Sequence, residues 1–110
     1  MTTWFITRHH GATEWAKQQG LNIDRQLSHL DLDDIEKGDL VIGILPVNLI
    51  AELNQKNARY LHLVLPLPKS LRGQEISAAM MTQLGARLEE YQVKRIQKIT
   101  NNSNHDLREN

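Results

Sequence analysis

Residues 40–68 read LVIGILPVNLIAELNQKNARYLHLVLPLP. The continuous apolar run over residues 40–45 is typical of a strand that is covered on both faces. Pro46 is suited to open the helix that the pattern predicts over residues 47–56. A second apolar run, over residues 59–65, predicts another buried strand before a proline-rich turn. Strand, helix and strand therefore alternate, which indicates two parallel strands joined by a crossover helix.

The amino-terminal part of the chain has the same order of elements. Residues 3–7 are β-branched or aromatic, which predicts a buried opening strand. Apolar residues recur at helical spacing from Ala12, and Gly20 is suited to end that helix. Residues 22–30 alternate roughly between apolar and polar side chains and predict a second strand. The segment over residues 31–39, which is rich in acidic side chains, predicts a connecting loop with one helical turn.

The carboxyl-terminal part predicts one more helix and one more strand. Residues 75–90 carry an apolar stripe and predict an amphipathic helix. This stripe consists of Ile76, Ala79, Met80, Leu84 and Leu88. Residues 91–99 alternate and predict a last strand, at a sheet edge or in a dimer contact. Residues 100–110 include four Asn and predict a disordered tail.

Together these segments predict an α/β fold, in which helices flank a mostly parallel sheet with right-handed crossovers. The 110 residues of the chain are enough for one hydrophobic core but not for two, so we expect a single domain over residues 1–99. In sheets of this kind a ligand binds beyond the carboxyl ends of the strands. Three segments are expected to meet at that edge, namely residues 7–11, 45–48 and 66–73.

The overall composition excludes several classes of protein. Thirteen Lys and Arg balance 13 Asp and Glu, so the chain lacks the electric field that attracts proteins to long nucleic acids or anionic membranes. The chain has no Cys, which excludes disulfide frameworks, cysteine-ligated zinc, iron–sulfur clusters and thiol nucleophiles. Its apolar runs are shorter than a membrane span. We therefore expect a cytoplasmic protein that binds a small anionic ligand.

The stretch Thr7-Arg8-His9-His10-Gly11 carries most of the chemistry. A strand end, a glycine and a helix start present backbone N–H groups and the positive end of a helix dipole to an anion. Arg8 adds a planar fork that grips phosphate at two points, and the two histidines supply proton donors or acceptors near neutral pH. The predicted phosphate site has catalytic Arg8, His9 and His10, and ligand contacts from Thr7, Gly11 and Ala12.

The same stretch also has a purely structural interpretation. Arg8 and one histidine would then cap a loop or pair with the acidic residues 31–39. Neighbouring side chains in an extended chain point in opposite directions, so His9 and His10 are poor joint ligands and we expect no metal site. We also expect no cofactor.

The other two segments at the predicted edge supply further candidate ligand contacts, namely Leu45, Pro46, Asn48, Arg72 and Gly73. Asn48 could donate to a ligand or satisfy the backbone at the start of a helix. Arg72 could contact an anion, although a lone surface arginine is usually only solvated. His62 and His29 are each more often hydrogen-bonded core residues than catalysts, and His29 could also pair with Asp31.

Residues 8–15 resemble the Arg-His-Gly-x-Thr signature of histidine phosphatases and phosphoglycerate mutases, which also follows a first strand. The resemblance covers eight residues and requires one inserted histidine. Those enzymes are much longer, and they complete the phosphate pocket with further arginines and a late histidine. This resemblance implies a phosphoryl-transferring enzyme as a remoter alternative.

A second resemblance extends from Trp4 to about Lys94. The chain is similar, over several ordered motifs, to small CRISPR-associated proteins of type III systems in the sixteenth Csx family. The motifs are Thr7-Arg8-His9-x-Gly11-Ala12, His29-Leu30-Asp31, Gly38-Asp39-x-Val41-Ile42-Gly43-x-Leu45-Pro46-Val47, Ala58-Arg59-Tyr60-Leu61-His62-Leu63, Arg72-Gly73-x-Glu75 and Leu84-Gly85-Ala86-Arg87-Leu88-Glu89.

This resemblance implies a Rossmann-like fold related to the CRISPR-associated Rossmann fold (CARF) domains. It also implies a dimeric ring nuclease that binds cyclic oligoadenylate messengers, principally the four-membered ring, and opens them to switch off type III signalling. The chain departs from the family pattern at His10, where proline is common, at Ile44, where threonine is common, and at Asn48, where histidine is frequent. Those departures leave the binding role intact and leave open which side chain transfers protons.

The implied reaction uses a nucleophile that the ring itself carries, the ribose 2′-hydroxyl beside each phosphodiester, so it requires no metal. Arg8 and the backbone N–H groups near Gly11 would stabilise the charge that builds on the phosphate, by about 3 to 4 kcal/mol. His9 or His10 would transfer the protons. The alternative from another functional class is a sponge or sensor, which binds the same ring without cleaving it.

Overall fold

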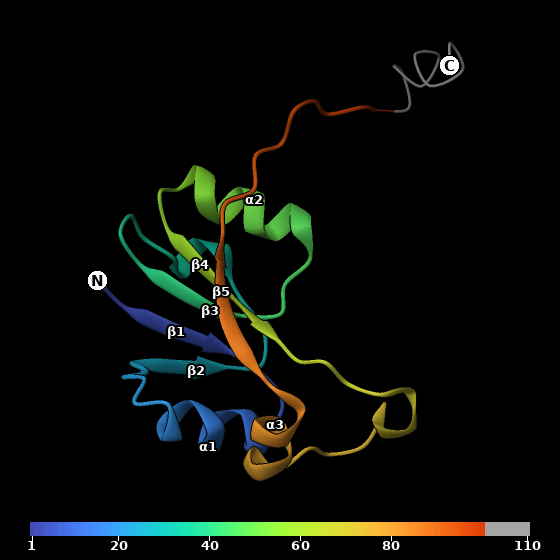
Figure 1. Cartoon of the computed structure of the whole chain (residues 1–110). Helices are drawn as coiled ribbons and strands as arrows, with labels where there is room; N and C mark the ends of the chain where they lie inside the picture. Colours follow the sequence, from blue (N-terminus) through green and yellow to red (C-terminus); the bar gives the residue numbers. More distant parts are fainter. Residues whose placement is uncertain (101–110) are drawn as a thin grey trace.

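A computed structural model describes residues 1–100 of the chain. Five strands form one sheet in the order β2-β1-β3-β4-β5 (Figure 1). The parallel strands are β1 (Thr3–Ile6), β2 (Arg25–Leu27), β3 (Leu40–Gly43) and β4 (Arg59–Val64). The edge strand β5 (Arg87–Tyr91) is antiparallel to β4. The predicted α/β fold with a mostly parallel sheet is therefore confirmed.

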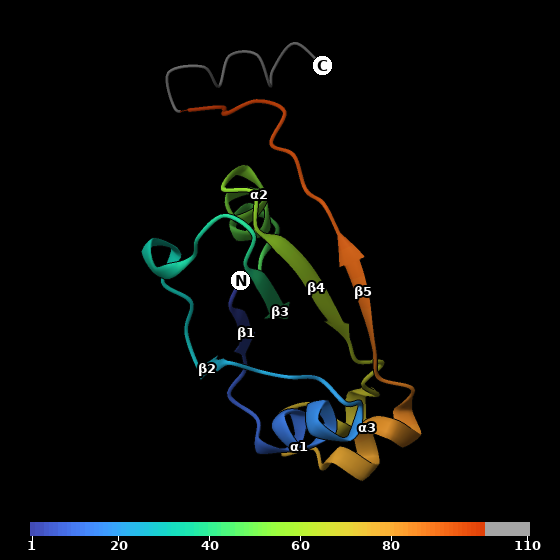
Figure 2. The ribbon, with the colours of Figure 1, turned by 90° about the vertical axis from the view of Figure 1, so that its left-hand side faces the viewer.

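Helices cover both faces of this sheet (Figure 2). On one face, α1 (His10–Gln18) packs against α3 (Ala78–Leu84). On the opposite face lies α2 (Val47–Gln55). Two short 3₁₀ turns, η1 (Leu32–Asp34) and η2 (Lys69–Leu71), belong to the connecting loops. The predicted flanking helices are thus present on both faces.

The side chains of β1 alternate between two hydrophobic cores, one on each face of the sheet, so the expectation of a single core was wrong. Phe5 packs in the core that includes Trp15 of α1 and Met81 of α3. Trp4 packs in the other core, which includes Ile50 of α2. All four residues of β1 are buried, because both faces of a central parallel strand are covered. The residues that follow β1 therefore start from a fixed position.

Hydrogen bonds to the Asp39 side chain connect the start of β1 to the start of β3. Its carboxylate accepts the Thr2 N–H at 2.9 Å, the Trp4 indole N–H at 3.1 Å and the Glu36 N–H at 3.0 Å. Burial of this side chain acts to raise its pKa, but the hydrogen bonds outweigh burial and hold the pKa of Asp39 below its ordinary value of 3.8. The carboxylate is therefore ionised at neutral pH although Asp39 is only 4% exposed.

The order of the strands reverses between β1 and β3. These two strands are neighbours in the sheet, although β2 lies between them in the sequence. The helix that follows β1 and the helix that follows β3 accordingly leave for opposite faces. In parallel sheets the crevice beyond such a reversal is the usual position of a ligand. Residues 7–9 and residues 44–46 lie at this edge.

The predictions for the carboxyl-terminal helix and strand were wrong. The helix predicted over residues 75–90 spans only α3, because the Ser77 hydroxyl caps its first turn and Gly85, with a φ of 83°, ends it in the left-handed conformation. The strand predicted over residues 91–99 begins earlier, as β5. Leu88, which fits the helical stripe, is a strand residue that pairs with Leu63.

The bounds of the other helices and strands differ less from the predicted ones. The first helix begins at His10 rather than at Ala12, and the second strand, predicted over residues 22–30, is only β2. The acidic loop contains the predicted helical turn, η1. Apart from Thr100, the predicted tail lies outside the described residues. Within residues 1–100, no helix combines the length and the apolar character that crossing a bilayer requires.

Candidate functional site

The segment between β1 and α1, residues 7–9, forms a tight elbow at the carboxyl edge of the sheet. The Thr7 N–H donates to the Leu27 carbonyl at 2.9 Å, which continues the pairing of β1 with β2. The His9 N–H then donates to the Thr7 hydroxyl at 3.1 Å. His9 occupies the N-cap position of α1 in an extended conformation, and His10 is the first helical residue. The elbow thus presents both histidines at the positive end of a helix dipole.

A cavity of about 560 Å³ opens beside this elbow. One wall consists of Thr7, Arg8, His9 and His10, and the other consists of residues 26–29 at the end of β2. The side chains of Arg8 and of both histidines belong to exposed residues, so solutes have access to them. The structure therefore brings four of the predicted site residues together around one solvent-accessible space.

His29 faces Arg8 across this cavity. The Arg8 Nη2 atom lies 3.3 Å from Nε2 and 3.5 Å from Nδ1 of His29. A single guanidinium nitrogen of Arg8 thus contacts both ring nitrogens of His29. Among residues 1–100, the other guanidinium N–H groups have no hydrogen-bond acceptor, which leaves them available for an oxyanion. The prediction of a core position for His29 was wrong, because the residue is exposed.

Gly11 and Ala12, predicted as ligand contacts, have packing roles in the structure. A side-chain carbon at Gly11 would lie 1.8 Å from the Ile76 carbonyl oxygen, so only glycine lets α1 approach the segment before α3 this closely. Ala12 is 2% exposed and belongs to the core shared by α1 and α3. Gly11 and Ala12 therefore hold the elbow in place through their packing.

The remaining predicted contacts lie outside the elbow cavity. Leu45 donates its N–H to the Tyr60 hydroxyl at 3.0 Å, and Pro46 is the N-cap residue of α2. Arg72 and Gly73 follow η2 in the long loop between β4 and α3, where both are exposed. The structure therefore does not bring these four predicted contacts into the elbow cavity.

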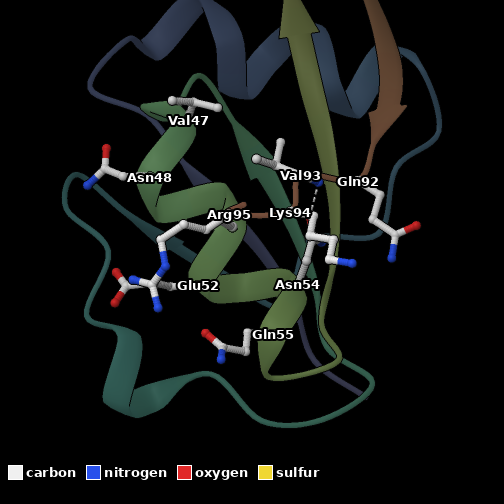
Figure 3. Close-up of a pocket in the computed structure, with 10 residues that line it drawn as sticks. Val47, Asn48, Glu52, Asn54, Gln55, Gln92, Val93, Lys94 and Arg95 are labelled. Atoms are coloured by element: carbon white, nitrogen blue, oxygen red, sulfur yellow. Dashed lines mark hydrogen bonds between the residues drawn. The ribbon is translucent and has the colours of Figure 1, made fainter. Parts of the chain in front are cut away.

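Asn48 lines a second cavity, of about 680 Å³, between α2 and residues 92–95 (Figure 3). Asn54 joins the two walls, since its side-chain oxygen accepts the Val93 N–H at 2.7 Å and its side-chain nitrogen donates to the Ala58 carbonyl at 3.1 Å. Lys94 and Arg95 contribute positive charge to the outer wall. This cavity is a groove along α2, distinct from the elbow cavity.

The model of a protein family described as "Putative CRISPR-associated protein (Cas_VVA1548)" matches residues 4–94. The chain belongs to this CRISPR-associated family. The family match runs from β1 through β5, so it includes the elbow, His29 and the groove along α2 up to residue 94. No curated protein and no solved structure matched the chain.

Proposed function

We propose that this member of the CRISPR-associated family is a cytoplasmic ring nuclease, which binds cyclic oligoadenylate, with cyclic tetra-adenylate as the preferred ring, and opens it. The observation that carries the proposal is the elbow cavity, in which Arg8 and three histidines surround one space at the carboxyl edge of a parallel sheet. Membership of the family supports a role in CRISPR biology. The type III setting and the messenger come from the resemblance of the sequence motifs.

The elbow suits a phosphodiester for two physical reasons. The amino end of α1 provides backbone N–H groups and a positive dipole end for an anion. The Arg8 guanidinium provides further donors in a planar fork, and the contact with His29 uses only its Nη2 side. A bound phosphodiester would therefore have both directional hydrogen bonds and a full positive charge beside it.

Ring opening needs no nucleophile from the protein. The 2′-oxygen of one ribose forms a bond to the adjacent phosphorus, while the bond from that phosphorus to the 5′-oxygen of the next nucleotide breaks. A base takes the 2′-hydroxyl proton, and an acid gives a proton to the leaving 5′-oxygen. The product is a linear oligoadenylate with a 2′,3′-cyclic phosphate at one end and a 5′-hydroxyl at the other. Arg8 would stabilise the charge on the phosphate oxygens.

A dimer is part of this proposal. A ring of identical nucleotides repeats its phosphates by symmetry, so a protein with two-fold symmetry can present two elbows to one ring. Sedimentation at increasing protein concentration, with and without the ring, tests this point. A species with the mass of two chains bound to one ring is the expected result.

The function is tested by incubating the protein with cyclic tetra-adenylate in buffer containing EDTA and resolving the products by chromatography and mass spectrometry. We expect linear products with a cyclic phosphate end. Recovery of the intact ring after stoichiometric binding would identify a sponge or sensor instead. Absence of binding at high micromolar protein would contradict both functions.

A further inference from the structure

His29 lies opposite Arg8 at the carboxyl edge of the sheet. The last residues of β1 and β2, Ile6 and Leu27, are direct partners in the parallel pairing of these strands. Arg8 and His29 are each the second residue beyond those partners. Neighbouring strands lie about 4.8 Å apart, so the two side chains leave the sheet from adjacent positions. The pairing of β1 with β2 therefore places His29 in the wall of the elbow cavity that faces Arg8.

A phosphate held by Arg8 would also lie close to His29. The Arg8 Nη2 atom is 3.3 Å from the His29 Nε2 atom. A phosphate oxygen that accepts from this same Nη2 at about 2.9 Å would be no more than about 6 Å from His29 Nε2. In a ring joined by 3′,5′-phosphodiesters, each 2′-hydroxyl is on the ribose carbon next to the one that bears the phosphate. A phosphate at Arg8 thus brings a 2′-hydroxyl into the neighbourhood of the His29 imidazole.

The His29 side chain is free to react with a solute in the cavity. It is exposed, and among residues 1–100 its ring has no hydrogen-bond partner other than the Arg8 guanidinium. From the other wall of the cavity, the titratable groups that face it are Arg8, His9 and His10. The acidic residue nearest to it in the chain is Asp31, whose carboxylate caps η1.

The contact with Arg8 suits an imidazole that accepts a proton. A guanidinium only donates hydrogen bonds, so a neutral imidazole, which has a lone pair, fits beside it and an imidazolium does not. When an anion takes over the guanidinium, the lone pair of His29 becomes free. A neutral imidazole with a free lone pair, beside a hydroxyl of the bound ligand, has the properties of a general base.

We propose that His29 is the general base of ring opening and that an elbow histidine on the opposite wall is the acid. This inference rests on the proposed function. In-line displacement places the attacking 2′-oxygen and the leaving 5′-oxygen on opposite sides of phosphorus, and the cavity has His29 on one wall and His9 and His10 on the other. His29 takes the 2′-hydroxyl proton as the 2′-oxygen bonds to phosphorus. His9 or His10 gives a proton to the 5′-oxygen as its bond to phosphorus breaks.

His29→Gln is the decisive variant, because the glutamine amide keeps polar atoms at the cavity wall but cannot take up a proton. We expect single-turnover opening of cyclic tetra-adenylate to slow by about 100-fold or more. The dissociation constant of the ring should change by less than about threefold, since Arg8 remains. His62→Gln is the matched control and should keep the wild-type rate. It removes a histidine that bonds to the Tyr60 hydroxyl and is not among the residues that line the elbow cavity.

A ring with sulfur in place of each leaving 5′-oxygen distinguishes the base from the acid. A thiolate leaves without protonation, because the ordinary pKa of a thiol is only about 8.5. The elbow variant that lacks the acid, His9→Gln or His10→Gln, should therefore recover its rate on this ring. His29→Gln should stay slow on it, since the 2′-hydroxyl still has to lose its proton.

Several results would overturn the inference and leave the proposed function intact. One is a rate for His29→Gln within about threefold of the wild type. Another is recovery of His29→Gln on the sulfur-containing ring, which would make His29 the acid. A third is a defect of His29→Gln that saturation with cyclic tetra-adenylate removes, which would limit His29 to the positioning of Arg8. Failure of the wild-type protein to open the ring overturns both the inference and the proposed function.

Discussion

Gly11 in α1 and Ile76 before α3 are in such close contact that a single methyl group does not fit between them. The carbon of an alanine at position 11 would lie 1.8 Å from the Ile76 carbonyl oxygen, a backbone atom that cannot swing away. At Gly43 the corresponding distance, to the Ile6 carbonyl oxygen, is 3.0 Å. The two glycines thus differ in how much the surrounding backbone must move to accept a side chain.

We expect Gly11→Ala to lower the free energy of unfolding by about 3 kcal/mol or more, although alanine is the better helix former. Gly43→Ala should cost less, about 1 kcal/mol, because a shift of a few tenths of an ångström relieves its contact. Urea denaturation followed by circular dichroism measures both values. Equal costs, or a larger cost at Gly43, would contradict the packing described for α1.

Asp39 should make the stability of the protein depend on acid pH. Its folded-state pKa lies below the ordinary value of 3.8, so the ionised carboxylate stabilises the fold above that pH, and the contribution is lost as the pH falls through the folded-state pKa. We expect Asp39→Asn to reduce the unfolding free energy at pH 7 by about 1–3 kcal/mol, because the backbone donors lose a charged acceptor.

The pH dependence of stability distinguishes the effect of the ionised Asp39 carboxylate from a general destabilisation of the fold by the substitution. The difference in stability between Asp39→Asn and the wild type should shrink as the pH falls below 3.8. Asp33→Asn, at an exposed carboxyl of the same acidic loop, is the control and should follow the wild-type curve. A constant difference between Asp39→Asn and the wild type from pH 7 to pH 2 would exclude the ionised carboxylate as the cause.

Arg8 should govern binding rather than folding. Arg8→Ala removes an exposed guanidinium, so the unfolding free energy should change by less than about 0.5 kcal/mol. Binding of cyclic tetra-adenylate should weaken by about 1.5–3 kcal/mol, the usual contribution of a charge-assisted hydrogen bond. Arg8→Lys keeps the charge and loses the fork, and should recover only part of this affinity.

Isothermal titration calorimetry measures these affinities. Lys17→Ala is the matched control, because it removes an exposed cation from the opposite end of α1. Equal losses for Arg8→Ala and Lys17→Ala would show that net charge, and not the elbow, attracts the ligand.

Gly85 should set the boundary between α3 and β5. Its φ of 83° is costly for any residue with a side-chain carbon, so Gly85→Ala should reduce the unfolding free energy by about 1–2 kcal/mol. Gln83→Ala, on an exposed position of the same helix, should change stability by less than about 0.5 kcal/mol. A Gly85→Ala variant as stable as the wild type would mean that α3 does not need a left-handed stop.

The sequence predicts the central sheet well and the last helix and strand poorly, and the reasons are local. Continuous apolar runs such as residues 40–45 indicate a doubly covered strand whatever its neighbours are. Leu84 and Leu88, in contrast, are four residues apart. This spacing fits one face of a helix as well as one face of a strand, so it does not distinguish the two. Gly85 between them was the available signal that the helix ends.

The candidate site was predictable only in part, because its two halves come from different strands. Residues 7–11 were found from their own sequence, since a strand end, a basic residue and a glycine are adjacent there. His29 joins them only because β2 pairs with β1. Such relationships are tertiary, and no local pattern encodes them.

The two tryptophans lie in different layers of the molecule, Trp4 beneath α2 and Trp15 in α1. Each is therefore a fluorophore that reports on one side of the sheet alone. Variants that retain a single tryptophan would show by emission spectroscopy whether the two layers melt in one transition or in two. The chain thus carries its own pair of optical probes, and no external dye is needed to follow either layer.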